Sequence, residues 1–296
     1  MLSDSDKQFA GQEGTTYDLR LKPKAGSTYY YTITNTTDIQ IETEEKDIEN
    51  LNKSTVGLLY AINKDSTGNY LFKMTYDKVH LYTKNGDVET EADGANAKFA
   101  MNPVEKMLGA LQDASLVATI TPTGEVKQIS GYKELSDRLL SNLNSNDPNA
   151  RQILQKQLDK IIGEGMVRNN LDQLFKMFPD SAVHLGDKWK INSRQSGDLN
   201  LNTYTFYRLN EITDGVAHIS SESDIQSNNV PMALMGSSIT TNLNGDQKGE
   251  YKLEAGTGML LNGNITSDIK GTIQMRGREI PIKIKINVQI KNTNKG

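Results

Sequence analysis

Cysteine is absent from this sequence of 296 residues. Its absence excludes disulfide bonds, thiolate nucleophiles and cysteine-ligated zinc sites. Long apolar runs are also missing, since no stretch of the sequence approaches the roughly 20 residues of a membrane-spanning helix. The net charge of -4 provides no basic surface of the kind that nucleic-acid-binding proteins carry. We therefore expect a protein that does not bind nucleic acid.

Catalytic and metal-binding motifs are scarce as well. The histidines His80, His184 and His218 show neither HxH nor HExxH spacing, so the sequence predicts no metal site, and no motif indicates a cofactor. His184 and Asp187 are close in sequence, but no GxSxG motif supplies a nucleophile to pair with them. The protein is therefore predicted to have no catalytic residues and not to be an enzyme. Carboxylates from different strands could still pair as in a glycoside hydrolase.

Alternation of apolar and polar residues dominates both ends of the chain. Apolar side chains occupy every second position from Ile280 to Ile290, which is typical of a strand with one buried and one wet face. The segment from Ser27 to Glu45 is rich in tyrosine, threonine and β-branched residues and predicts another long strand. Asn85-Gly86 predicts a hairpin with a type I′ turn. Long strands of this kind favour a curved antiparallel sheet.

The middle of the chain has helical periodicity instead. Pro103 is placed to begin a helix, and Met107, Leu108 and Leu111 fall on one face of it. Further apolar stripes predict a helical block over residues 131–178. The predicted fold class is therefore α+β and β-dominated: one large, curved, open-barrel-like antiparallel sheet, with the helices packed on its concave face.

The expected organisation is a disordered tether over residues 1–16 and a single domain over residues 17–292. Within that domain, a first β half (17–130) and a second β half (179–292) flank the helical block. Short patterns such as Thr-Gly turns recur in the same order in both halves. Two explanations stay open, a true internal duplication and the chance similarity of alternating strands joined by glycine turns.

Two apolar, methionine-bearing segments interrupt the strand regions at corresponding places of the two halves. Methionine adapts well to variable apolar ligands, so these segments could close the ends of a hydrophobic cavity. They could equally cover the core, which is the usual role of an apolar helical stripe. The candidate ligand-binding residues are Met107, Leu108, Leu111, Met232, Leu234 and Met235.

Trp189 is the only tryptophan, and it follows a turn at Gly186 and Asp187. A large aromatic side chain beside a tight turn is most simply a packing anchor. These three residues are therefore predicted to be structural rather than ligand-binding.

Three stretches of the chain resemble a known family. They are YDLRLKPKAGSTYYY (Tyr17–Tyr31), FPDSAVHLGDKW (Phe178–Trp189) and GEYKLEAGTGML (Gly249–Leu260). Phe-Pro followed by Gly-Asp-x-Trp is similar to the pattern of uncharacterised Bacteroidetes envelope lipoproteins, a domain-of-unknown-function family. The resemblance implies export, a lipid anchor and no assigned activity. The lipobox cysteine of such a family is absent here, which agrees with a mature segment whose export signal has been removed.

The expected function is that of a non-enzymatic cell-envelope protein that binds a lipid or another apolar ligand between sheet and helices. One alternative is a surface protein with a solid core that holds a partner or a glycan, and a less favoured one is a hydrolase with dispersed carboxylates. A cytoplasmic location is the alternative to the envelope. The sequence predicts no particular ligand and no oligomeric state.

Overall fold

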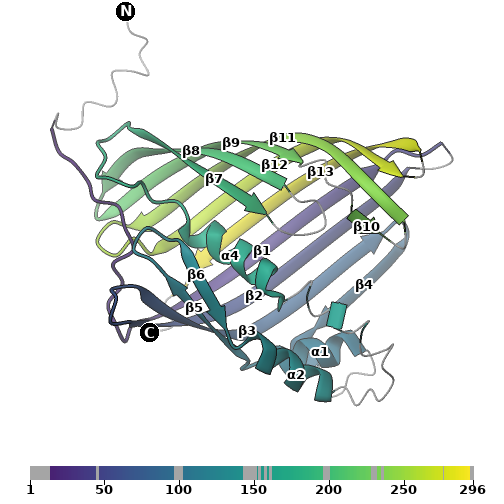
Figure 1. Cartoon of the computed structure of the whole chain (residues 1–296), viewed down its shortest axis with the longest axis horizontal. Helices are drawn as coiled ribbons and strands as arrows, with labels where there is room; N and C mark the ends of the chain where they lie inside the picture. The colour runs from purple at the N-terminus through teal and green to yellow at the C-terminus, as the bar shows by residue number, and fades with distance from the viewer. Residues whose placement is uncertain are drawn as a thin grey trace, which may run out of the picture.

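One antiparallel sheet dominates the molecule, as the computed structural model shows (Figure 1). The structure describes residues 14–44, 47–96, 103–142, 152, 155–156, 159, 162–195, 201–227, 232–234, 237–275 and 277–293. Within these residues the sheet has 13 strands. They are β1 (Thr28–Ile41), β2 (Ile48–Lys64), β3 (Tyr70–Asn85), β4 (Val88–Asp93), β5 (Ser115–Ile120), β6 (Val126–Ser130), β7 (Lys188–Gln195), β8 (Leu201–Thr213), β9 (Val216–Ser227), β10 (Met232–Leu234), β11 (Ser237–Glu254), β12 (Leu260–Met275) and β13 (Arg278–Asn292).

The two halves of the sheet meet where the first strand pairs with the last. Neighbouring strands follow the order β6-β5-β3-β2-β1-β13-β12-β11-β9-β8-β7, with β4 added to β3 and β10 added to β11. The β1–β13 seam is antiparallel and unbroken from Tyr31 opposite Asn292 to Ile41 opposite Ile282. The predicted β-dominated α+β class with a curved antiparallel sheet is therefore confirmed. The internal duplication and the single-domain boundaries stay predictions.

The alternation predicted for the carboxyl-terminal strand is confirmed in β13. Its even-numbered apolar side chains are buried, as at Ile284 and Val288, or half-buried, and the lysines between them, such as Lys283 and Lys285, are exposed. Because side chains of a strand point alternately to its two faces, β13 presents apolar side chains to one face of the sheet and polar side chains to the other.

The hairpin between β3 and β4 forms as predicted, but the type I′ turn at Asn85-Gly86 is wrong. Asn85 pairs with Val88, so the two loop residues are Gly86 and Asp87. Of these two, Gly86 alone has a positive φ, +59°. A glycine with positive φ at the first loop position is the pattern of a type II′ turn. The slip of one residue arises because the strand absorbs Asn85 into its hydrogen-bonded ladder.

The β8–β9 hairpin has the turn that was expected for β3–β4. Its loop residues Asp214 and Gly215 both have positive φ, 52° and 76°. Positive φ at both positions is the requirement of a type I′ turn.

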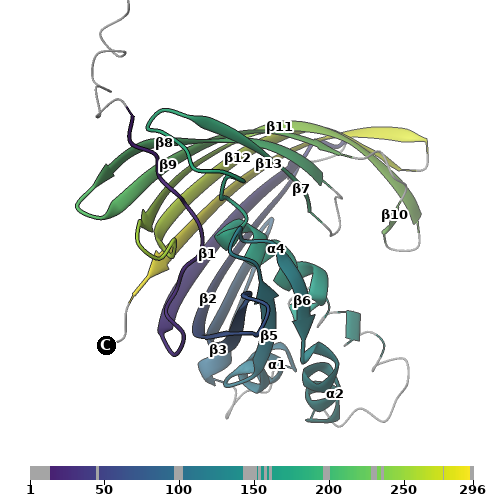
Figure 2. The ribbon, with the colours of Figure 1, turned by 60° about the vertical axis from the view of Figure 1, so that its left-hand side comes forward.

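Three described α-helices accompany the sheet: α1 (Pro103–Leu111), α2 (Tyr132–Asn142) and α4 (Glu164–Phe175), with a short 3-10 helix, η2 (Gly94–Asn96). Figure 2 shows that the sheet curves and that α4 lies on its concave side. Val167, Leu171 and Leu174 of α4 are buried as predicted, and Phe175 is buried with them. Phe178, the fourth residue of the predicted stripe, is also buried but lies beyond the end of the helix. The part of the predicted helical block between residues 143 and 161 falls largely outside the described residues. None of the described helices combines the length and apolar character needed to cross a lipid bilayer.

The main core lies between α4 and the concave face. Aromatic rings from three strands and from α4 meet there, with ring centroids of Tyr31 and Tyr60 5.5 Å apart and those of Phe72 and Phe175 4.9 Å apart. The Tyr31–Tyr60 contact is edge-on and the Phe72–Phe175 contact is tilted, and aromatic contacts of this kind add to the free energy gained by burial. A second buried apolar cluster lies further along the strands and contains Leu201, Ile225, Leu243, Ile269, Ile282 and Ile284.

Candidate functional site

A cavity of about 210 Å³ lies between α4 and the concave face, and we call it the α4 cavity. Its buried lining side chains are all from the apolar and aromatic classes: Leu58, Met74, Tyr76, Val79, Val167 and Val288. Its half-buried lining residues include the polar Asn35, Ser54, Asn170 and Gln173, while Met166 is 37% exposed. The cavity therefore has an apolar floor and a polar rim.

Register between neighbouring strands builds the sheet wall of the α4 cavity. Ile33 of β1 lies opposite Val56 of β2, which in turn lies opposite Val79 of β3. The three side chains form one apolar row across three strands, because directly paired residues point to the same face.

A β-bulge sets the rest of this wall. The β2–β3 register shifts between Gly57 and Leu58, which leaves Asp77 as an extra residue between Tyr76 and Lys78. Such a bulge reverses the alternation locally, so both Tyr76 and Val79 point inward. The signal in the sequence is a change of phase, because the apolar residues stand mainly at even positions up to Tyr76 and mainly at odd positions from Val79 onward.

The carboxylate of Asp77 is engaged at the bulge. It accepts a hydrogen bond of 2.6 Å from the hydroxyl of Tyr30. Partial burial, followed by the hydrogen bond and the charge of Asp77, raises the pKa of Tyr30 to about 12. This contact ties β1 to β3 across the intervening β2.

A smaller cavity of about 40 Å³ lies on the opposite flank of α4 and contains the charged groups. Asp172, Lys176 and Arg194 line it. Burial raises the pKa of Asp172, and the ammonium group of Lys176, 3.9 Å away, opposes that shift. Asp172 is the only carboxylate among the described lining residues, so this cavity lacks the carboxylate pair that glycoside hydrolysis requires.

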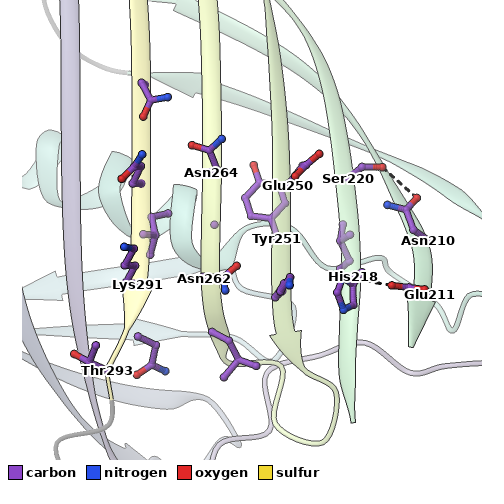
Figure 3. Close-up of a pocket in the computed structure, with 18 residues that line it drawn as sticks. Asn210, Glu211, His218, Ser220, Glu250, Tyr251, Asn262, Asn264, Lys291 and Thr293 are labelled. Atoms are coloured by element: carbon purple, nitrogen blue, oxygen red, sulfur yellow. Dashed lines mark hydrogen bonds and ion pairs between the residues drawn. The ribbon is translucent and has the colours of Figure 1, made fainter. Parts of the chain in front are cut away.

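The outward face of the sheet carries a wide groove of about 750 Å³, which we call the outer groove (Figure 3). Amide side chains from β8, β12 and β13 line it: Asn210, Asn262, Asn264, Asn287 and Gln289. Its charges are mixed, with Glu211 and Glu250 beside Lys252 and Lys291. Figure 3 shows His218 next to Glu211, with 3.6 Å between Nδ1 and the carboxylate. Such a lining both donates and accepts hydrogen bonds and has no strong net charge.

The described candidate ligand-binding residues lie in two different elements, α1 and β10. Met107, Leu108 and Leu111 are at most 3% exposed and pack in the main core, where they do not line the α4 cavity. This position agrees with the alternative interpretation, in which α1 covers the core. Met232 and Leu234 lie in β10, which pairs with β11, and Met235 lies outside the described residues. A ligand-binding role for these residues stays a prediction.

The segment predicted to be a structural anchor, from Gly186 to Trp189, makes close contacts with its neighbours. Trp189 is half-buried against the core, stacks on Tyr207 at 5.9 Å and donates a hydrogen bond of 2.9 Å from Nε1 to the carbonyl of Met177. Gly186 has a positive φ of 87°. The carboxylate of Asp187 accepts hydrogen bonds from the backbone N–H and the ring of His184, and these bonds lower the pKa of Asp187. The His184–Asp187 pair thus closes the turn before β7.

Metal-ligand geometry is not found in the described part of the chain. No group of three or more histidine, aspartate or glutamate side chains there is arranged to hold a metal ion.

The fold and the α4 cavity together define a class of protein: a strongly curved antiparallel sheet with a helix on its concave face. The chain belongs to the family of unknown function DUF6263, whose model matches residues 67–260. That match includes all of α4 and of β3, two of the elements that line the α4 cavity. A search of the curated proteins finds no match.

Solved structures with the same kind of sheet include lipovitellin, in a study of its lipid–protein interactions. The likeness to lipovitellin has a TM-score of 0.54 at 8% identity and covers 92% of this chain. The chain spans only a quarter of the lipovitellin chain (25%). OccK7 of Pseudomonas aeruginosa and an outer membrane channel of Pseudomonas putida match at 6% identity over 90% and 92% of this chain and 99% and 97% of theirs. Their TM-scores of 0.25 and 0.24 are too low to establish a shared architecture.

Proposed function

We propose that the protein is a non-enzymatic binding protein whose α4 cavity holds the apolar part of a ligand, such as an acyl chain. The observation that carries the proposal is the cavity itself, with its buried apolar floor beneath α4. Transfer of an acyl chain from water to such a floor is favourable by ~0.8 kcal/mol per methylene. The lipid–protein interactions named for lipovitellin, which has a similar sheet, support the same class of ligand.

The size of the cavity limits the ligand. Its volume of about 210 Å³ exceeds by several times the ~30 Å³ that one water molecule occupies in the liquid. It is nevertheless smaller than the roughly 300–1,000 Å³ of pockets that enclose drug-sized ligands. We therefore infer that it accommodates one slim chain, or one end of a longer molecule that continues over the concave face.

The test uses N-phenyl-1-naphthylamine, a neutral dye that becomes fluorescent in apolar surroundings, with protein purified without detergent. Val56 lines the α4 cavity, and its neighbour Thr55 lies on the opposite face of β2. Val56→Phe fills the cavity and should weaken dye binding about tenfold, whereas Thr55→Phe should leave it unchanged. Circular dichroism checks that both variants are folded. Equal affinity in all three proteins would show that the dye binds elsewhere and would reject the proposal.

A location in the cell envelope, with a lipid anchor, is the second part of the proposal. Its support is the resemblance of the Phe178–Trp189 and Gly249–Leu260 stretches to envelope lipoproteins. Expression of the complete natural gene, followed by separation of membrane and soluble fractions, tests it. Recovery of the product in the cytoplasmic fraction would contradict it and would favour the cytoplasmic alternative.

The outer groove favours a second candidate function, the binding of a glycan on the outward face. Sugar hydroxyls both donate and accept hydrogen bonds, as do the amides that line the groove. Calorimetric titration with neutral oligosaccharides tests this candidate. Asn264→Leu should abolish the heat of binding, while Asn242→Leu, on the outward face of β11 but outside the groove, should preserve it. Identical titrations for the two variants would rule out the groove as the site.

A further inference from the structure

The polar groups of the α4 cavity are gathered at its rim. Asn35 and Ser54 lie directly opposite each other on β1 and β2. Asn170 and Gln173 are three positions apart on α4, so they project from the same side of the helix. The two pairs therefore face the cavity from its two walls, one from the sheet and one from the helix.

These rim groups can bind a ligand. In the described part of the chain, the side chains of Ser54, Asn170 and Gln173 have no hydrogen-bonding partner. Each of them can both donate and accept a hydrogen bond. A ligand head group at the rim would therefore meet unused donors and acceptors.

All four rim groups are uncharged, and no charged side chain lines the α4 cavity among the described residues. The charged groups of this region, Asp172, Lys176 and Arg194, line the smaller cavity on the other flank of α4. An ionised head group in the α4 cavity would lose hydration without gaining an opposite charge, which is costly. An uncharged head group that hydrogen-bonds to the amides does not have this cost.

We propose that the α4 cavity selects amphiphiles with an uncharged, hydrogen-bonding head group, such as an alcohol, ester or amide, over acyl chains that end in a carboxylate or phosphate. This inference rests on the proposed apolar-ligand function and narrows its ligand class. The apolar floor holds the chain, and the neutral rim determines which head group is accepted.

Displacement of N-phenyl-1-naphthylamine by decanol and by decanoate at neutral pH tests the selectivity. Decanol should displace the dye at a concentration about tenfold lower than decanoate, because decanoate must bury a carboxylate without a partner. Asn170→Lys places a cation at the rim and should reduce or reverse this preference. Asn169→Lys is the matched control, because Asn169 lines the smaller cavity instead, and it should keep the preference for decanol.

The outcomes separate the two proposals. If neither compound displaces the dye, the apolar-ligand function fails. If decanoate displaces the dye as well as decanol does, the apolar-ligand function stands and the head-group selectivity is overturned. The selectivity is also overturned if Asn169→Lys and Asn170→Lys change the preference equally, since the rim would then have no special role.

Discussion

Gly124 holds the end of α4 against the sheet. It has a φ of +84°, and a Cβ atom added to it would lie 1.8 Å from the carbonyl oxygen of Phe175, in the last turn of α4. No side chain fits there, because real Cβ contacts are far longer. The position of α4, and with it the width of the α4 cavity, therefore depends on this glycine.

Gly124→Ala should destabilise the fold much more than Gly68→Ala. Gly68 has a similar φ of +91°, but nothing lies within 4 Å of the position that a Cβ atom would take. Gly68→Ala should therefore show only backbone strain, about 1–2 kcal/mol. Gly124→Ala adds a clash with the backbone and should cost at least about 2 kcal/mol more. Urea unfolding measured by circular dichroism gives both values, and equal losses would mean that the close approach to Phe175 is unimportant.

Cross-strand rows of like charge mark the outward face of the sheet. Asp246 of β11 lies directly opposite Asp224 of β9 on one side and Asp268 of β12 on the other. At the seam, Asp38 of β1 instead lies opposite Lys285 of β13. Like charges placed opposite each other are destabilising, and opposite charges are stabilising.

Asp246→Asn should therefore raise the free energy of unfolding, by about 0.2–1 kcal/mol at low salt. Asp38→Asn, the matched control, should lower it by a similar amount, because it removes attraction to Lys285. Added salt should shrink both effects, since exposed charges are screened. Urea midpoints at low and high salt measure them, and the same sign for both variants would contradict the row interpretation.

Asp172 makes the contribution of α4 to stability dependent on pH. Burial raises its pKa in the folded state above the unfolded value of 3.8, so the ionised form is disfavoured in the fold. Its ionisation therefore costs stability at neutral pH, and this cost disappears as the pH falls below about 4 and both states are protonated.

Asp172→Asn should accordingly be more stable than the unchanged protein at neutral pH. The difference between their free energies of unfolding should shrink as the pH falls. Unfolding by urea across the acidic range measures it. Asp180→Asn, at an exposed aspartate, serves as the control. Its free energy of unfolding should change with pH in the same way as that of the unchanged protein. A difference for Asp172→Asn that persists at low pH would show that lost contacts, and not ionisation, cause the effect.

A helix or strand can be predicted from the sequence where the periodicity of its own apolar residues is sufficient to identify it. The alternation around Ile284 predicts β13, and the stripe of Leu171 and Leu174 predicts α4, because burial on one face governs both. The turn at Gly86 was mispredicted by one residue, since the end of the strand depends on pairing with Val88. The β-bulge at Asp77 leaves a local trace, the change of phase between Tyr76 and Val79, but only the pairing with β2 identifies Asp77 as the extra residue.

The sequence predicts that an apolar space lies between the sheet and the helices, but it does not predict which residues line the α4 cavity. An apolar space between sheet and helices followed from the amphipathic patterns. Its walls combine Ile33, Val79, Val167 and Val288, which come from four separate elements. Which strands become neighbours is a matter of long-range pairing, and no local pattern encodes it. The sequence therefore predicts ligand-binding residues in the methionine-bearing segment around Met107, but this segment forms α1 and packs in the core.

At the scale of the whole molecule, the β1–β13 seam joins the two halves into one sheet. Because β1 of the first half is hydrogen-bonded to β13 of the second half, we expect the two halves to unfold together. The fluorescence of Trp189, the only tryptophan, reports on β7 in the second half, and far-ultraviolet circular dichroism reports on the entire sheet. The two signals should give the same urea midpoint. Separate midpoints would contradict the single-domain prediction and would assign an independent stability to each half.

The seam also governs when the protein can finish folding during its synthesis. Glu42, just after β1, contacts Lys283 of β13 across 241 positions of the chain. On the ribosome, β1 therefore waits with one edge unpaired until nearly all of the other strands have been made. Unpaired edges are prone to join the wrong chain. The nascent protein should therefore depend on chaperones that shield this edge, and a chain arrested before β13 should be a target for them.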